Sequence, residues 1–135
     1  MRPFRIVVAG HGDLADALVS SAQLICGMVE DLHAVGLRPD DSPESFAERL
    51  TATIADDDVP VLLLTDLVGG TPHNVALAVT RRRDGAVLIS GVNLAVLIEA
   101  ATTTDALDAT LQERLVEGGR GALVDATSLV ASRSP

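Results

Sequence analysis

The chain has 135 residues, of which 47% are hydrophobic, and this length suits one domain with a real core rather than two. Tyr and Trp are absent and the formal net charge is −9, which disfavours base stacking and phosphate-backbone binding, so no nucleic-acid partner is expected. The single cysteine excludes an internal disulfide. The first apolar run is too short for a signal peptide or a membrane span, so a cytoplasmic location is expected.

The first half of the chain predicts two strands, each followed by a helix. The strands are the apolar segments Ile6–Ala9 and Leu32–Leu37. A helix is expected to begin at Gly12 or Asp13, after the first strand. Pro43 is expected to open the second helix, since proline suits the first helical position.

A central strand and two further units follow. Val59–Thr65 is almost continuously apolar, as expected of a parallel strand that is covered on both faces. Thr71 as N-cap and Pro72 at the first helical position then predict a helix start. Ala86–Ser90 is expected as a fourth strand, and Leu94–Ala101 as the helix after it.

The C-terminal part predicts one more helix and one more strand. An amphipathic helix is expected over Thr104–Glu117, and the glycines at 118, 119 and 121 are expected to break it. Ala122–Ala126 is expected as a last short strand. Residues 1–135 are interpreted as a single domain in which 128–135 form a flexible tail.

This alternation of strands and helices predicts an α/β fold with an open, doubly wound, mostly parallel sheet and helices on both faces. In such folds the ligand site lies outside the carboxyl ends of the strands. Three polar loops are expected to meet there: Gly10–Asp13, Asp66–Asn74 and Gly91–Asn93.

His11 is the main candidate for chemistry, because it stands between two glycines where a buried strand turns into a helix. An imidazole placed beside a helix N-terminus can accept a phosphoryl group and have the new charge stabilised. Asp66 ends the neighbouring strand and can orient the imidazole. The alternatives are a turn histidine that is bonded only to backbone, and an aspartate that caps the Gly69-Gly70 turn.

The phosphate contacts expected are the backbone N–H groups of Gly70 and Thr71, the Thr71 hydroxyl, and Gly12 at the start of the first helix. Thr71 also has the simpler interpretation of a helix cap, and the two roles are compatible. His11, Asp66 and His73 could in principle bind a metal, but no ligand-spaced motif supports that cluster, so neither metal nor cofactor is expected.

Gly10–Ala15 also satisfies the G-x-G-x-x-A pattern of dinucleotide-binding turns. The chain is too short for a complete dehydrogenase, and no acidic partner for a ribose is clearly placed after the second strand. A serine hydrolase is disfavoured because no G-x-S-x-G elbow is present.

Three segments together carry a family resemblance: Val7–Gly12, Leu64–Asn74 and Ile89–Glu99. They resemble the IIA component of the mannose family of the bacterial phosphoenolpyruvate-dependent sugar phosphotransferase system (PTS). The likeness extends from about Arg5 to Ala126, and three motifs in the right order make it specific.

The resemblance implies a flavodoxin-like sheet and a homodimer in which a C-terminal antiparallel strand, here Ala122–Ala126, is exchanged between subunits. It implies that His11 receives a phosphoryl group on Nε2 from the phosphocarrier HPr and passes it to a IIB component, while Asp66 holds Nδ1–H. The chain would thus be a phosphotransferase without a fused IIB domain, in contact with the membrane only through a permease complex.

Three positions depart from the family pattern. Val68 stands where sugar-transporting relatives often have an aromatic residue, Ala95 where proline is common, and His73 at a typically apolar position. Partner recognition is therefore open. Two other functions remain: the phosphocarrier subunit of a dihydroxyacetone kinase, which uses the same histidine chemistry, and a non-catalytic nucleotide- or metabolite-binding regulatory module.

Overall fold

Four parallel strands form the centre of the fold, in the order β2-β1-β3-β4. They are β1 (Arg5–His11), β2 (Leu32–Leu37), β3 (Val61–Thr65) and β4 (Ala86–Ser90). The computed structural model describes residues 1–133, and every strand pair within them is parallel. The expected open parallel sheet is confirmed, with all four predicted strand positions occupied.

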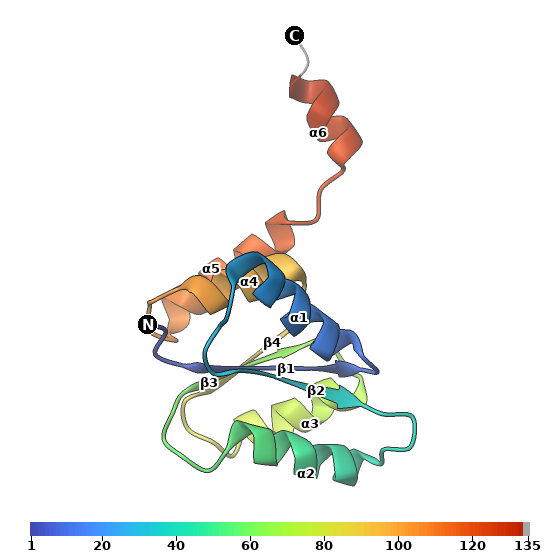
Figure 1. The fold of residues 1–135 in the computed structure, drawn as a ribbon, viewed down its shortest axis with the longest axis vertical. Coiled ribbons are helices and arrows are strands. Elements are labelled where there is room, and N and C mark those ends of the chain that lie inside the picture. Colours follow the sequence, from blue (N-terminus) through green and yellow to red (C-terminus); the bar gives the residue numbers. More distant parts are fainter. Residues whose placement is uncertain (134–135) are drawn as a thin grey trace.

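Helices cover both faces of this sheet (Figure 1). The layer above it holds α1 (Leu14–Cys26), α4 (Leu94–Thr102) and α5 (Ala109–Gly121), and the layer below holds α2 (Pro43–Ile54) and α3 (Thr71–Thr80). The two layers enclose two separate hydrophobic clusters. The doubly wound arrangement is therefore confirmed.

The alternation of side chains along each strand decides which cluster a residue joins. In β1, Ile6 and Val8 pack with α1, α4 and α5, whereas Val7 and Ala9 pack with α2 and α3. All five residues of β3 are buried, because this strand lies inside the sheet and is covered on both faces. That is the physical reason for its unbroken apolar sequence.

The last long helix differs from its predicted form. It runs over Ala109–Gly121, and its N-cap is Asp108, whose side chain accepts a hydrogen bond from the Leu111 N–H. Gly118 and Gly119 lie inside the helix, so the prediction that they break it is wrong. Both face α4: a Cβ added at Gly118 would lie 2.4 Å from Oε1 at the flexible end of Glu99, and one at Gly119 would lie 3.4 Å from Val96 Cβ.

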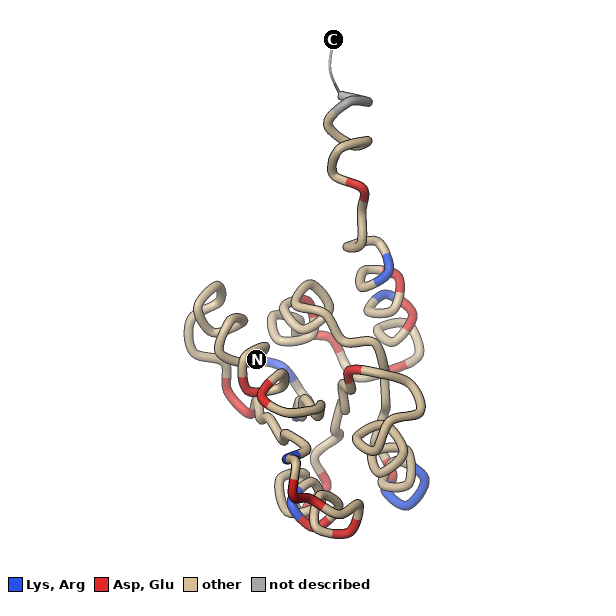
Figure 2. The backbone as a smooth tube through the Cα atoms, turned by 90° about the vertical axis from the view of Figure 1, so that its right-hand side faces the viewer, with Lys and Arg blue, Asp and Glu red and all other residues tan. Residues whose placement is uncertain are grey.

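The predicted strand over Ala122–Ala126 is also wrong for the single chain. Residues 123–125 belong to no helix or strand, and the side chain of Leu123 is 89% exposed. A strand needs a partner, and this segment leads away from the chain's own sheet into α6 (Ala126–Arg133), which stands clear of the body (Figures 1 and 2). Mobility of the tail stays a prediction, and residues 134–135 lie outside the described part.

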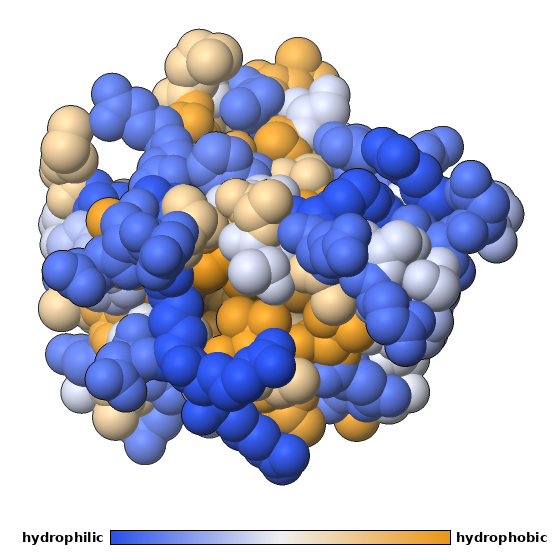
Figure 3. Space-filling model, turned by 90° about the horizontal axis from the view of Figure 1, so that it is seen from below, coloured by the Kyte–Doolittle hydropathy of each residue, from blue (hydrophilic) through white to orange (hydrophobic). Residues whose placement is uncertain are grey.

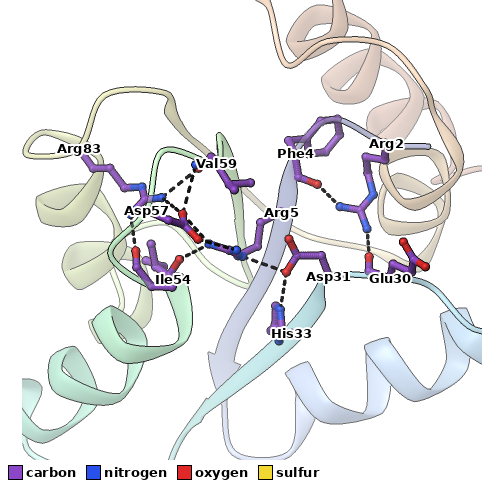
Figure 4. A network of polar contacts seen from close by, with 11 residues as sticks. Arg2, Phe4, Arg5, Glu30, Asp31, His33, Ile54, Asp57, Val59 and Arg83 are labelled. Carbon is purple, nitrogen blue, oxygen red and sulfur yellow. Dashed lines mark hydrogen bonds and ion pairs between the residues drawn. The ribbon is translucent and has the colours of Figure 1, made fainter.

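A network of charged side chains closes the amino-terminal edge of the sheet (Figure 4). Arg5 at the start of β1 bonds Asp31 Oδ1 at 2.9 Å and Asp57 Oδ2 at 2.9 Å. Arg83 bonds Asp57 Oδ1 at 3.0 Å and the Val59 carbonyl at 2.9 Å. These bonds tie the start of β1 to the segments that precede β2, β3 and β4.

Seen from below, the surface is mostly hydrophilic, and hydrophobic residues gather near its middle (Figure 3). Within residues 1–133, no helix combines the length and the apolar character that a membrane crossing requires.

Candidate functional site

The three predicted loops meet at the carboxyl edge of the sheet. β1 and β3 are neighbours, with Ala9 opposite Thr65. His11, two residues after Ala9, and Asp66, directly after Thr65, therefore come close together at the strand ends. The carbonyl oxygen of Thr65 accepts hydrogen bonds from the N–H groups of Gly91 and Val92, both at 2.9 Å. This edge is also the topological switch point, because the chain leaves β1 toward β2 on one side and reaches β3 on the other.

One carboxylate oxygen fixes the orientation of the imidazole. Asp66 Oδ2 lies 2.7 Å from His11 Nδ1 and accepts the backbone N–H of His11 at 2.9 Å. Oδ1 accepts the N–H of Leu67 at 2.9 Å. The side chain of Asp66 is 8% exposed and that of His11 is 48% exposed. The carboxylate is therefore enclosed while the ring faces outward.

Gly10 makes room for that carboxylate. A Cβ at position 10 would lie 3.3 Å from Asp66 Oδ2. The glycine before His11 thus permits the close approach of Asp66 on which the ring's orientation depends.

The charge state of Asp66 decides the tautomer of His11. Burial raises the pKa of Asp66, but the hydrogen bonds from the His11 N–H, the His11 ring and the Leu67 N–H outweigh it, so the pKa lies below its usual value. At neutral pH the carboxylate is ionised and can only accept hydrogen bonds. Nδ1 must therefore carry the proton, which leaves the lone pair on Nε2.

The start of α3 lies against the same ring. A Cβ on Gly70 would be 2.9 Å from His11 Cε1 and 3.3 Å from Nε2. Gly70 is the N-cap of α3 and Thr71 its first residue, so the prediction of Thr71 as N-cap is wrong by one position. A side chain at position 70 would press against the imidazole, which explains why the cap residue is a glycine.

Two helix N-termini beside His11 are left without a side-chain cap. The N-caps Asp13 of α1 and Gly70 of α3 make no side-chain hydrogen bond to their helices. In contrast, Ser42, Asn93 and Asp108 cap α2, α4 and α5 in this way. Uncapped first-turn N–H groups and the positive end of the helix dipole favour an anion next to the imidazole.

Gly12 serves the turn itself. Its φ of +58° is a left-handed conformation that favours glycine, and its N–H donates to the Leu37 carbonyl at 2.8 Å. Gly36 of β2 lies beneath it, where a Cβ would come within 2.3 Å of the Gly12 oxygen. The Gly12 donor is engaged in this structure, and its predicted contact with a phosphate stays a prediction.

The other histidines lie apart from the His11–Asp66 pair. Nδ1 of His73 lies 2.6 Å from Ser90 Oγ, whereas His33 bonds Asp31 near the amino edge. The described residues contain no group of three or more His, Cys, Asp or Glu side chains placed to hold a metal ion. Asn93, in the third loop, caps α4 and donates to the Gly119 carbonyl at 2.9 Å, so it braces α5 as well.

The surface around His11 combines exposed apolar side chains with a shallow groove. Leu14, Leu67 and Val68 are exposed, Val68 to 77%. A groove of about 380 Å³ runs from Gly12 past Arg38.

Sequence reasoning missed the steric roles of Gly36 and Gly70 and the bond between His73 and Ser90. Glycines at strand ends and helix starts are nevertheless a signal of close approach between segments.

A family model described as the PTS system fructose IIA component matches residues 5–115 of this chain. The fructose-specific EIIA component of Bacillus subtilis is 30% identical over 104 residues, which cover 76% of this chain and 71% of that protein. The mannose-specific EIIAB component of Escherichia coli is 30% identical over 102 residues, 74% of this chain but only 32% of that longer protein.

Solved structures of PTS IIA proteins also superpose on this chain. The mannose/sorbose specific IIA subunit from Enterococcus faecalis superposes with a TM-score of 0.86 at 31% identity, covering 92% of this chain and 94% of that one. The EIIA component from Streptococcus agalactiae superposes with a TM-score of 0.84 at 28% identity, covering 93% and 98%.

Proposed function

This chain belongs to the PTS fructose/mannose IIA family, and on that premise we propose that it is a phosphocarrier. It accepts a phosphoryl group on Nε2 of His11 from phospho-HPr and passes the group to a IIB component. The observation that carries the proposal is the bond between His11 Nδ1 and Asp66 Oδ2, 2.7 Å long, which leaves Nε2 free beside the uncapped start of α3.

The chemistry is an in-line displacement at phosphorus. The Nε2 lone pair of His11 attacks the phosphorus of the donor's phosphohistidine, the new P–N bond forms, and the electron pair of the old P–N bond returns to the donor's imidazole. The His11 ring gains positive character, which the Asp66 carboxylate stabilises through the Nδ1–H. The same step in reverse, with a IIB component in place of the donor, empties the site.

The phosphoryl oxygens are held by backbone groups and one hydroxyl. The N–H groups of Gly70 and Thr71 and the Thr71 hydroxyl lie at the start of α3, where the helix dipole favours negative charge. Exposed Leu14, Leu67 and Val68 around the ring offer apolar contact to the partner that docks there. We place the reaction in the cytoplasm.

We also propose the homodimer with an exchanged strand. β4 is an edge strand, and beside it lies a groove of about 690 Å³ lined in part by Leu88, Ile89 and Val116. The segment that contains Leu123 and Val124 leaves the body with both side chains exposed. Antiparallel addition of residues 122–126 of a second copy would pair the free edge of β4 and cover these apolar side chains.

The test is the intact mass of the purified chain after incubation with phosphoenolpyruvate, enzyme I and HPr, beside the His11→Ala variant. One acid-labile phosphoryl group on the wild type alone supports the carrier. No phosphorylation of the wild type, with the same donors active on another IIA protein, contradicts it. The dihydroxyacetone kinase subunit shares this first step, and onward transfer to a IIB component rather than to a kinase subunit distinguishes the two.

A further inference from the structure

A row of three polar side chains lies beneath the start of α3. Thr65 Oγ1 is 2.6 Å from Ser90 Oγ, and Ser90 Oγ is 2.6 Å from Nδ1 of His73. Thr65 and Ser90 are directly paired at the ends of β3 and β4, on the sheet face that α3 covers, and His73 is the third residue of α3. The row therefore connects the first turn of α3 to two strand ends.

The protons of this row have one arrangement that satisfies every group. Thr65 is fully buried, so its hydroxyl needs a partner inside the protein. If the Thr65 hydroxyl donates to Ser90 and the Ser90 hydroxyl donates to His73 Nδ1, both protons meet acceptors. The opposite direction leaves the Thr65 proton without an acceptor among the hydrogen bonds found in residues 1–133. His73 is therefore the final acceptor, with its own proton on Nε2.

The position of the first turn of α3 matters because Gly70 lies against the His11 ring. A Cβ there would be 2.9 Å from Cε1, so a shift of a few tenths of an ångström changes the clearance over Nε2 and the direction of the Thr71 N–H. The loop before Gly70 is exposed. The Asn74 side chain donates to the Gly69 carbonyl, but this bond stays within the start of α3 and does not connect it to the sheet. Within the described residues, the His73–Ser90 bond is the side-chain hydrogen bond that ties this turn to the sheet.

We propose that His73 is a positioning residue for phosphoryl transfer: through Ser90 and Thr65 it sets the height of the α3 N-terminus over Nε2 of His11. The inference rests on the proposed function. His73 does not touch the phosphoryl group, so it acts on the rate of transfer and not on the docking of the donor.

The test is a rapid-quench measurement of phosphoryl acceptance over a range of phospho-HPr concentrations. We expect His73→Leu to lower the maximal rate about tenfold, since small misplacements of an anion site are costly, with the half-saturating donor concentration unchanged. His73→Asn is expected to restore most of the rate, because its side-chain oxygen can accept the Ser90 proton in place of Nδ1. His33→Leu, the same change near the amino edge, is the matched control and is expected to transfer at the wild-type rate.

Two further readouts separate positioning from a general loss of structure. Ser90→Ala removes both bonds of the row, so it is expected to lose at least as much rate as His73→Leu, and the double variant is expected to be no slower than Ser90→Ala alone. Nitrogen NMR of the wild type is expected to show His73 protonated on Nε2. A wild-type maximal rate in His73→Leu, a loss confined to the half-saturating concentration, or failure of His73→Asn to restore the rate would overturn the inference. A wild-type chain that accepts no phosphoryl group instead removes the proposed function, and the inference with it.

Discussion

At the scale of single residues, the site depends on one oxygen atom with two partners. Asp66 Oδ2 accepts both the backbone N–H and the ring Nδ1 of His11. The residue types and their meeting at one sheet edge follow from the sequence, because parallel strands end together. Which nitrogen is free does not follow from spacing, since it depends on a bond between residues 55 positions apart.

Asp66→Asn tests the importance of this carboxylate. The amide can present its NH₂ group to Nδ1, which moves the ring proton to Nε2 and blocks the nucleophile. We expect phosphoryl acceptance to fall by about 10²-fold or more, as for other orienting aspartates. The measurement is the rate of labelling by phospho-HPr, with Asp84→Asn, exposed at the amino edge, as the control. Equal rates in Asp66→Asn and wild type would remove Asp66 from the mechanism.

Gly70→Ala tests the clearance above the ring. The φ of −78° at Gly70 suits alanine, so the variant should fold, but its Cβ would lie 2.9 Å from His11 Cε1. The ring must then tilt away from Asp66 or from α3, and we expect at least about tenfold slower acceptance. Gly121→Ala places the same methyl group in open space and serves as control. An unchanged rate in Gly70→Ala would show that the start of α3 does not define the site.

At the scale of elements, the sequence allowed most of the fold to be predicted. The apolar runs located all four strands, and Leu32–Leu37 and the start of α2 at Pro43 agree to the residue. Glycine was misinterpreted in α5, because a pattern cannot distinguish a helix end from a close approach between helices. A Cβ added at Gly119 would lie 3.4 Å from Val96 Cβ, and this approach between the helices is visible only in the packed structure.

The same reasoning predicts opposite outcomes for two alanine substitutions. In Gly36→Ala the new Cβ would meet the backbone oxygen of Gly12 at 2.3 Å, and we expect the free energy of unfolding to fall by about 1–3 kcal/mol. In Gly118→Ala the new Cβ meets the flexible end of Glu99, and the helix gains about 1 kcal/mol of propensity. Urea unfolding curves measure both, and a neutral Gly36→Ala would contradict the tight support of the His11 turn.

At the scale of the whole molecule, the outer edge of β4 and the exposed segment around Leu123 are the two features that the proposed dimer would bring together. The chain's pattern located an apolar segment at Ala122–Ala126 but could not say which sheet it would join, because exchange between copies leaves no mark in the sequence.

Leu123→Asp tests the proposed exchange of this strand between two copies. Light scattering should show a dimer for the wild type and a shift toward monomer for the variant, since a buried carboxylate is costly. Leu24→Asp, equally exposed but on α1, should remain dimeric. A monomeric wild type, or a Leu123→Asp dimer of unchanged strength, would contradict strand exchange.

The amino-edge network predicts part of the acid response of the fold. Hydrogen bonds from Arg5, together with those from Arg83, lower the pKa of Asp57 to about 2 (Figure 4). An unfolded aspartate has a pKa of about 3.9, so the stabilisation is complete above about pH 4 and is lost as the pH falls toward 2. Urea unfolding at each pH should show a shallower loss of stability over this interval in Asp57→Asn than in the wild type. Parallel curves would show that Asp57 does not contribute.

The most direct test of the central claim is long-range proton–nitrogen NMR of the ¹⁵N-labelled chain before and after phosphorylation by enzyme I and HPr. The structure predicts Nδ1 of His11 protonated in both states and the phosphoryl group on Nε2 of that ring alone. A phosphoryl group on Nδ1, on another residue, or on none, with the donors active, would contradict the account.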